Sequence, residues 1–182
     1  MTKPKGRRVT KPKGRRGKPN PESIRLRSLG RGLFELAPPS CVRERADDVA
    51  EVHKILAAGE IDLACDELRW LLEGCSDFLE VHVLLAQIAW DEGQVDLARG
   101  HFGYAHAVGR RALGPRFHGQ IPYGYEANRP LLEAGVGLAR CLAELGKKGD
   151  ARRVLAEVLA WDTGDPLGVR AIFEKLGQKS TR

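Results

Sequence analysis

The sequence predicts an all-α protein: a solenoid of about three helix-turn-helix repeats with a C-terminal capping helix and a disordered basic N-terminal tail. Three observations predict it. The hexapeptide GEIDLA at residues 59–64 recurs as GQVDLA at residues 93–98, an offset of 34 residues. Apolar residues on both sides of each copy recur at three- and four-residue steps, which is the period of a helix. Finally, residues 1–32 hold 12 of the 30 Lys and Arg and a single acid.

We expect residues 1–32 to form a disordered basic arm. The phrase TKPKGRRV is followed at once by TKPKGRRG, and prolines at four of the first 21 positions exclude a helix. After Met1 the first apolar residues are Val9 and Ile24, so the apolar region of a secretory signal is missing. The remainder of the chain carries 18 basic and 23 acidic residues. A cationic arm on an acidic body is typical of proteins that attract polyanions.

The two repeats, at residues 4–8 and 12–16, resemble the AT-hook. In that motif a glycine lets the backbone approach the minor groove of DNA while flanking cations enter it. Both copies depart from the core of that motif, because Lys replaces its first Arg and Arg replaces its closing Pro. Charge-driven binding to DNA or RNA phosphates does not depend on these two positions. The alternative is a tail that only solubilises the protein. The residues expected to bind nucleic acid are Lys3, Lys5, Arg7, Arg8, Lys11, Lys13, Arg15 and Arg16.

Residues 33–44 are expected to be an irregular linker, because the segment from residue 18 to 42 is rich in Pro, Gly and Arg. Its apolar residues 33–36 are expected to pack on the first repeat.

Each hexapeptide copy is expected to form the turn between two antiparallel helices, and GKKGDA at residues 146–151 is a weaker third copy. The leading glycine can end one helix in the left-handed conformation. The acid that follows suits the start of the next helix. An alanine then allows the two helices to approach closely, and a large apolar residue four positions later fills the gap to the next repeat. These alanines are Ala64, Ala98 and Ala151, and the large residues are Leu68, Phe102 and Leu155.

This pattern resembles the tetratricopeptide repeat (TPR), a 34-residue motif with a small residue at position 8, Ala at 20 and a large apolar residue at 24. The alignment gives units at about 45–78, 79–112 and 132–165 within a helical domain that spans residues 45–178. Position 8 is Ala86 in the second unit and Ala139 in the third, but Val52 in the first. The family's usual Trp at position 4 and Tyr at 11 are missing. The resemblance implies a scaffold for protein–protein interaction.

In such a scaffold the first helix of each unit lines a concave groove that binds a protein or peptide. Trp90 stands out, because exposed Trp is enriched at binding hot spots; ordinary packing between helices is the alternative. The acids of the groove favour a basic or apolar peptide. The resemblance places these partner-binding residues in the groove: His53, Glu80, Gln87, Trp90, Asp91 and Arg140.

An insertion at residues 113–131 separates the second and third units. Loops of this length in a compact domain are generally functional or disordered, and its aromatic residues favour order. One alternative is that the loop packs its own tyrosines; another is a metal or small-ligand site that uses the insertion. Its candidate residues are Phe117, His118, Tyr123 and Tyr125. Pro166 is expected to begin the capping helix, over residues 166–177.

No enzyme, cofactor or metal site is predicted. The chain has no GxSxG, Walker or GxGxxG motif, and His101 and His106 lie five residues apart on different helix faces. The spacing of the four cysteines fits no zinc motif, and Cys65 and Cys141 are expected to be core thiols. No apolar run approaches the roughly 20 residues of a membrane span. We therefore expect a cytoplasmic, non-catalytic scaffold whose arm contacts nucleic acid or a nucleoprotein, or else a pure protein-interaction module with a solubilising tail.

Overall fold

The computed structural model describes residues 23–177, which are mostly helical with one small sheet. The arm positions predicted to bind nucleic acid, residues 3–16, lie outside the described residues. The eight helices of the described part are α1 (Ser40–Glu44), α2 (Ala46–Ala57), α3 (Ile61–Gly74), α4 (Leu79–Asp91), α5 (Val95–Leu113), α6 (Arg129–Glu144), α7 (Lys148–Trp161) and α8 (Val169–Gly177). The all-helical body is thus confirmed, with a β-hairpin added to it.

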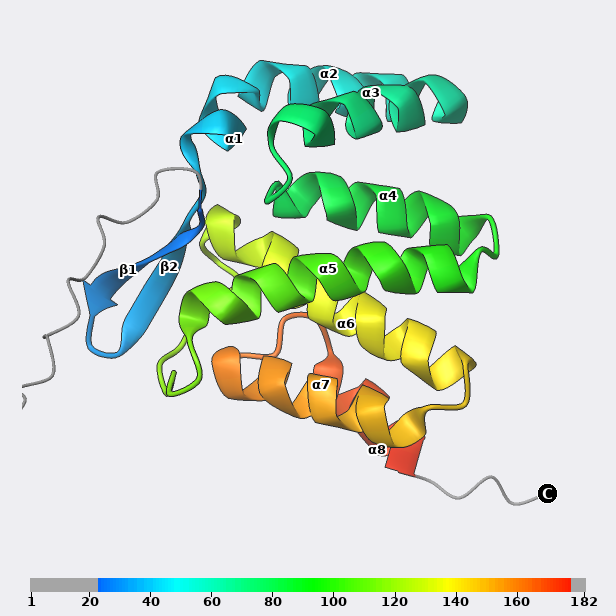
Figure 1. The fold of residues 1–182 in the computed structure, drawn as a ribbon. Coiled ribbons are helices and arrows are strands. Elements are labelled where there is room, and N and C mark those ends of the chain that lie inside the picture. The colour runs from blue at the N-terminus through cyan, green and yellow to red at the C-terminus, as the bar shows by residue number, and fades with distance from the viewer. Residues whose placement is uncertain (1–22, 178–182) are drawn as a thin grey trace, which may run out of the picture.

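Six of these helices form three hairpin pairs, α2/α3, α4/α5 and α6/α7, which lie one on another in chain order (Figure 1). Each pair turns at a predicted glycine with positive φ: 83° at Gly59, 74° at Gly93 and 74° at Gly146. In all three turns the amide after the glycine donates to the carbonyl five residues earlier, which is the Schellman pattern. The three copies of the hexapeptide therefore build the same turn, as predicted.

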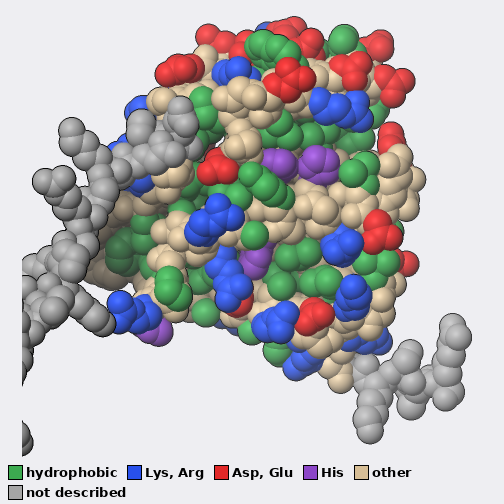
Figure 2. All heavy atoms as spheres, viewed as in Figure 1, with side chains coloured by type: hydrophobic (Ala, Val, Ile, Leu, Met, Phe, Trp, Pro, Cys, Tyr) green, Lys and Arg blue, Asp and Glu red, His purple; other side chains and the backbone are tan. Residues whose placement is uncertain are grey.

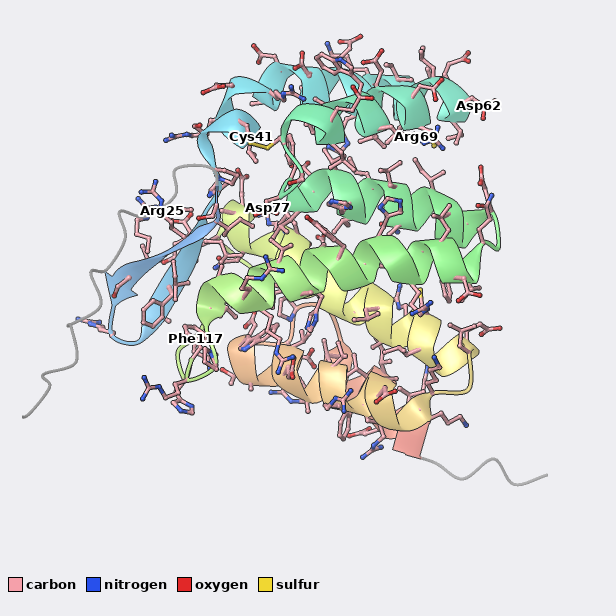
Figure 3. All side chains as sticks on the ribbon, in the orientation of Figure 1. Arg25, Cys41, Asp62, Arg69, Asp77 and Phe117 are labelled. Carbon is pink, nitrogen blue, oxygen red and sulfur yellow. A yellow bond between two sulfur atoms is a disulfide. The ribbon has the colours of Figure 1, made fainter. Side chains whose placement is uncertain are left out.

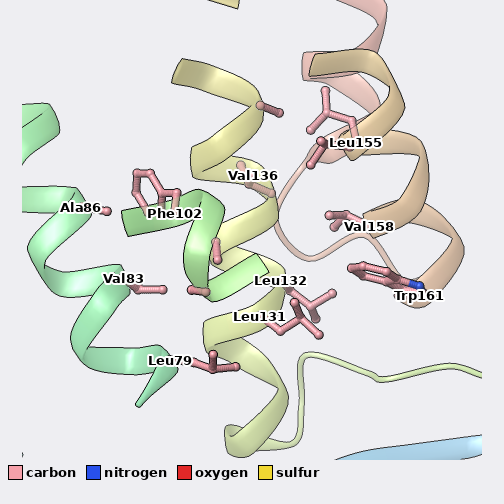
Figure 4. Packing of buried hydrophobic residues seen from close by; sticks show 14 of the residues in the cluster. Leu79, Val83, Ala86, Phe102, Leu131, Leu132, Val136, Leu155, Val158 and Trp161 are labelled. Atoms are coloured by element: carbon pink, nitrogen blue, oxygen red, sulfur yellow. The ribbon is translucent and has the colours of Figure 1, made fainter. Parts of the chain in front are cut away.

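The alanines predicted at the helix crossings, Ala64, Ala98 and Ala151, have no exposed surface. Large apolar residues fill the space between pairs, as Figure 4 shows for Phe102 between α4 and α6. A Cβ on Gly137 would come within 2.5 Å of the Phe102 ring, so this glycine makes room for the ring. Most buried residues belong to one cluster over α4–α8 and the sheet, and a smaller cluster surrounds α2 and α3.

Residues 33–44 are not an irregular linker. Residues 25–30, which were predicted to belong to the disordered arm, form a β-strand. Strand β1 (Arg25–Gly30) pairs antiparallel with β2 (Leu33–Ala37), and α1 follows. The Gly and Arg content that suggested irregular structure instead builds the hairpin turn, where Gly30, Arg31 and Gly32 all have positive φ. Residues 33–36 do not pack on the first repeat as predicted, since Leu36 belongs to the cluster of α4–α8. Cys41 and Val42 of α1 do pack against the cluster of α2 and α3.

The insertion is ordered against this hairpin. Residues 114–125 are irregular, a short 3-10 helix η1 (Glu126–Asn128) follows, and α6 begins three residues before the predicted third unit. The Phe34 amide donates to the Gln120 carbonyl at 2.8 Å, and the Gln120 amide donates to the Gly32 carbonyl at 2.9 Å. On its other side the Ile121 amide donates to the Trp161 carbonyl at 2.8 Å. The insertion therefore joins the β-hairpin to α7.

The capping helix α8 begins at Val169 rather than at Pro166. The carboxylate of Asp165 accepts from the Val169 amide at 2.5 Å and from the Arg170 amide at 3.1 Å. These bonds satisfy the first free amides of the helix, as an N-cap does, so the helix starts after Asp165 and its turn.

A disulfide joins Cys41 in α1 to Cys75, the residue after α3, across a sequence separation of 34. The sequence analysis did not predict this pair. Cys65 and Cys141 are free thiols. Cys141 is buried as predicted, whereas Cys65 is only partly buried and is not a core residue.

Candidate partner-binding face

The predicted groove residues lie on α2, α4 and α6 in two groups. His53 of α2 and Glu80 of α4 are joined by a hydrogen bond of 3.1 Å between Nε2 and Oε1. Further along α4, Gln87 and Trp90 line a cavity of about 20 Å³ with Arg140 of α6. Glu80 and Gln87 are two helical turns apart and so share one face of α4. The sixth residue, Asp91, is exposed at the end of the same helix.

Trp90 takes part in packing between helices, which was one of its two predicted alternatives. It is partly buried and packs against the main core cluster, yet it also lines the small cavity. Phe102 and Gly137 form part of the same cavity wall. The Trp90 ring and the Arg140 side chain therefore border a small recess.

A larger cavity, of about 210 Å³, lies where the β-hairpin meets the N-terminal ends of α4 and α6. Only Glu80 belongs both to this cavity and to the predicted groove. The cavity has apolar walls, and its charged lining residues are all acids: Asp77, Glu80 and Glu126. It was not predicted from the sequence, because the cavity exists only where the β-hairpin packs on the helices. For the rest of the text we call it the hairpin cavity.

Asn128 fixes the β-hairpin beside this cavity. The side chain is fully buried, and its Oδ1 accepts from the Leu36 amide at 2.9 Å. Its Nδ2 donates to the carbonyls of Phe34 and Pro122, both at 3.1 Å. One side chain thereby satisfies backbone groups of β2 and of the insertion. Without hydrogen-bond partners, these buried backbone groups would lower the stability of the folded protein.

The disulfide secures the opposite wall. Cys41 directly precedes Val42, which lines the hairpin cavity, and Cys75 lies two residues before Asp77, which also lines it. Figure 3 shows the bond between α1 and the turn that leads into α4, near Asp77. The cavity is therefore held by a covalent link on one side and by the Asn128 hydrogen bonds on the other.

Two histidines meet between α4 and α5. His82 Nε2 lies 3.0 Å from the Ser76 carbonyl, so it carries the proton, and the unprotonated Nδ1 of His82 accepts from His101 Nδ1 at 3.1 Å. Burial lowers the pKa of both rings. Tyr104 stacks on His82 and its hydroxyl donates to Asp77 at 3.4 Å. The two neutral histidines therefore help to hold the turn at Ser76 and Asp77, beside the hairpin cavity.

A third histidine, His106 of α5, is buried against α7. Its Nε2 lies 3.6 Å from Glu157 Oε2, too far for a hydrogen bond, and neither atom has another partner within residues 23–177. Burial, and secondarily the Arg110 guanidinium, lowers the pKa of His106 to about 4. At neutral pH the ring is therefore uncharged.

The insertion residues divide into two packed and two exposed side chains. Phe117 packs edge-on against Phe34 with ring centroids 5.2 Å apart, and the Tyr123 hydroxyl donates to Glu133 at 2.6 Å. His118 and Tyr125 are exposed. Across residues 23–177 no group of three or more His, Cys, Asp or Glu could hold a metal ion. The contacts of Phe117 and Tyr123 account for the order of the loop.

Charge is unevenly distributed over the body. Residues 45–78 hold nine acids and three bases. In Figure 2 the acidic side chains gather over α2 and α3 at the top of the view, and basic side chains are more frequent below. The α2/α3 end of the stack is therefore its more negative end, and Asp77 of the hairpin cavity belongs to the same acidic stretch of residues 45–78.

Comparisons of the chain with protein-family models, with curated proteins and with solved structures each find no match. A search of the described helices for one that could span a bilayer also finds none.

Proposed function

We propose that the chain is a non-catalytic, TPR-like scaffold. It holds a protein or peptide partner on the face formed by α2, α4 and α6, and its basic arm contacts nucleic acid or a nucleoprotein. The observation that carries the partner-binding half is the run of polar and aromatic side chains along α4 and α6, with Gln87, Trp90 and Arg140 around one recess. The three identical Schellman turns support the repeat assignment.

The arm half of the proposal rests on charge. Its cationic repeats are joined to a body whose first helical pair is strongly acidic, so the two parts suit different partners. A tail that only solubilises the protein is the alternative, and nucleic-acid binding separates the two.

To test the arm, the full chain is compared with a chain that begins at Ser23 and so retains β1. Binding to a 20-base-pair duplex is measured across a salt series. With about eight phosphate contacts, log K should fall against log salt with a slope near −7, and the shortened chain should bind far more weakly. A variant in which Lys and Arg of residues 3–16 are exchanged for each other keeps the charge and should bind similarly. Equal binding by the full and shortened chains contradicts the arm proposal.

To test the partner-binding face, proteins captured by the full chain are compared between two charge reversals. Arg140→Glu alters the recess, whereas Arg153→Glu alters an exposed arginine of α7 that pairs with Asp150. A partner held by the proposed face should be lost at least tenfold with the first variant and retained with the second. Equal retention by both variants removes this face from the proposal.

The proposed location is the cytoplasm. The Cys41–Cys75 disulfide argues in the other direction, since disulfides persist mainly in oxidising compartments. Rapid alkylation of thiols in intact cells, followed by mass spectrometry, decides the matter: a predominantly oxidised pair contradicts a reducing cytoplasmic location.

A further inference from the structure

The hairpin cavity is a preformed apolar recess of the size of a side chain. Leu36, Phe78 and Leu79 form part of its wall and are themselves buried, so their positions are fixed by the core. Its volume of about 210 Å³ lies below the roughly 300–1,000 Å³ of pockets that enclose drug-sized ligands. It greatly exceeds the 10–15 Å³ that one water requires. The recess therefore suits one large apolar side chain rather than a cofactor.

The rim of the recess selects for positive charge. The Glu126 side chain is 88% exposed, and its ion pair with Arg129 is long at 3.9 Å. The Glu80 side chain is 43% exposed, and its Oε1 lies 3.1 Å from Nε2 of His53. Asp77 accepts a long hydrogen bond from Tyr104. The three carboxylates are thus weakly compensated, and a Lys or Arg beside the apolar side chain would improve their electrostatic environment.

The arm of the chain itself fits this site poorly. Residues 1–22 are rich in Lys and Arg, but Val9 is their only aliphatic residue of the Val, Leu and Ile type. The arm can therefore match the acidic rim but offers little to the apolar walls. A segment that combines both features matches the whole site.

We propose that the hairpin cavity binds an extended segment of a partner protein, placing one Leu, Ile or Phe side chain in the recess and an adjacent Lys or Arg at Glu126 and Glu80. This inference rests on the proposed scaffold function and names the chemistry of its partner. Burial of one such side chain contributes about tenfold to a hundredfold in affinity, and the rim supplies the preference for basic neighbours.

Three acetylated heptapeptides serve as probes for the full chain: GSKLRSG, GSKSRSG without the apolar residue, and GSELESG with reversed charge. Binding is followed by backbone amide shifts in NMR spectra. GSKLRSG should shift amides of β2, α1 and the start of α4, and should bind at least tenfold more tightly than either control. A peptide with the sequence of residues 1–22 tests the arm as occupant.

Two variants and one control locate the site. Glu126→Lys reverses the exposed rim charge and should weaken GSKLRSG binding about fivefold or more. Val42→Phe fills the recess from α1 and should abolish the shifts. The control, Glu144→Lys, makes the same charge change at the other end of α6 and should leave binding unaltered. Because the Glu126 side chain is exposed, Glu126→Lys should leave the fold intact, so weaker peptide binding by this variant reports on the rim charge.

Other results overturn the inference in distinguishable ways. Shifts around Gln87 and Trp90 alone would preserve the partner-binding face but remove the hairpin cavity from it. Stronger binding by the peptide of residues 1–22 would identify the chain's own arm as the occupant. Self-association abolished by Glu126→Lys would identify a second copy. If none of the peptides binds and captured partners ignore Arg140→Glu, the inference and the scaffold function both fail.

Discussion

At the scale of single residues, Asn128 links the β-hairpin to the insertion. Its side chain meets one backbone donor of β2, one backbone acceptor of β2 and one acceptor of the insertion. An amide suits this position because it offers both an acceptor and two donor hydrogens. No other neutral side chain of that length does so, which makes the identity of residue 128 sharply constrained.

Replacement of Asn128 should therefore distinguish its donor and acceptor roles. Asn128→Ala leaves three buried backbone groups without this partner and should lower the free energy of unfolding by about 2–4 kcal/mol. Asn128→Asp keeps the acceptor for Leu36 but turns an oxygen toward the carbonyls of Phe34 and Pro122, so it should cost more still. Urea unfolding measures both. An aspartate variant as stable as the native chain would contradict this account of the hydrogen bonds.

His106 should make stability depend on pH. Its folded pKa, about 4, is below the unfolded value of 6.5, so between these values the unfolded chain binds more protons. The free energy of unfolding must then fall as the pH falls from about 6.5 to about 4, by up to roughly 3 kcal/mol from this residue. Urea unfolding at pH 7.5, 6 and 5 should show a shallower decline for His106→Gln. The exposed His118→Gln is the control, and identical declines for both variants would refute the assignment.

At the scale of elements, repeated sequence predicted repeated structure wherever the determinants were local. Gly59 and Gly93 end their helices because glycine, which has no Cβ, tolerates positive φ whatever its tertiary surroundings. The β-hairpin was missed because its pairing is completed by distant groups, namely Asn128 and the backbone of Gln120. The hairpin cavity depends on the hairpin and could not be predicted without it. The alignment of Glu80 and Gln87 on one face of α4 could be predicted, because it follows from helical spacing alone.

The turn glycines give a test at this scale with an internal control. Gly93→Ala places a Cβ on a residue with φ of 74°, which should cost about 1–2 kcal/mol of stability. Gly100 lies within α5, where an added Cβ would meet no atom within 4 Å. Gly100→Ala should instead stabilise the protein by up to about 1 kcal/mol. Thermal and urea unfolding of both variants measure the difference, and effects of the same sign would contradict the proposed role of the turn.

At the scale of the whole molecule, the body consists of two unequal parts. The cluster around α2 and α3 has nine buried residues, whereas the cluster of α4–α8 and the β-hairpin has 25. Stacked repeats are stabilised mainly by contacts with their neighbours, so the terminal pair with the smaller core should open first. The Cys41–Cys75 disulfide joins α1 to the residue after α3 and so links the two ends of the segment that holds this pair. The same pair carries the acidic surface, and the two cysteines flank it close to Val42 and Asp77, which line the hairpin cavity.

Loss of the disulfide should therefore loosen one end of the molecule. A link across 34 residues stabilises by up to about 4 kcal/mol in the chain-entropy description. With Cys41→Ser and Cys75→Ser combined, amides of α2 and α3 should exchange hydrogen many times faster, while those of α6 and α7 keep their protection. Cys65→Ser removes a thiol that is already free, so it should leave exchange unaltered. Equal acceleration of exchange in all helices would mean that the body opens as one unit. Unchanged exchange in α2 and α3 would mean that packing alone holds the first pair in place. Local acceleration would instead make the oxidation state of this pair a control on access to the hairpin cavity, because Val42 and Asp77 would then lose their fixed separation.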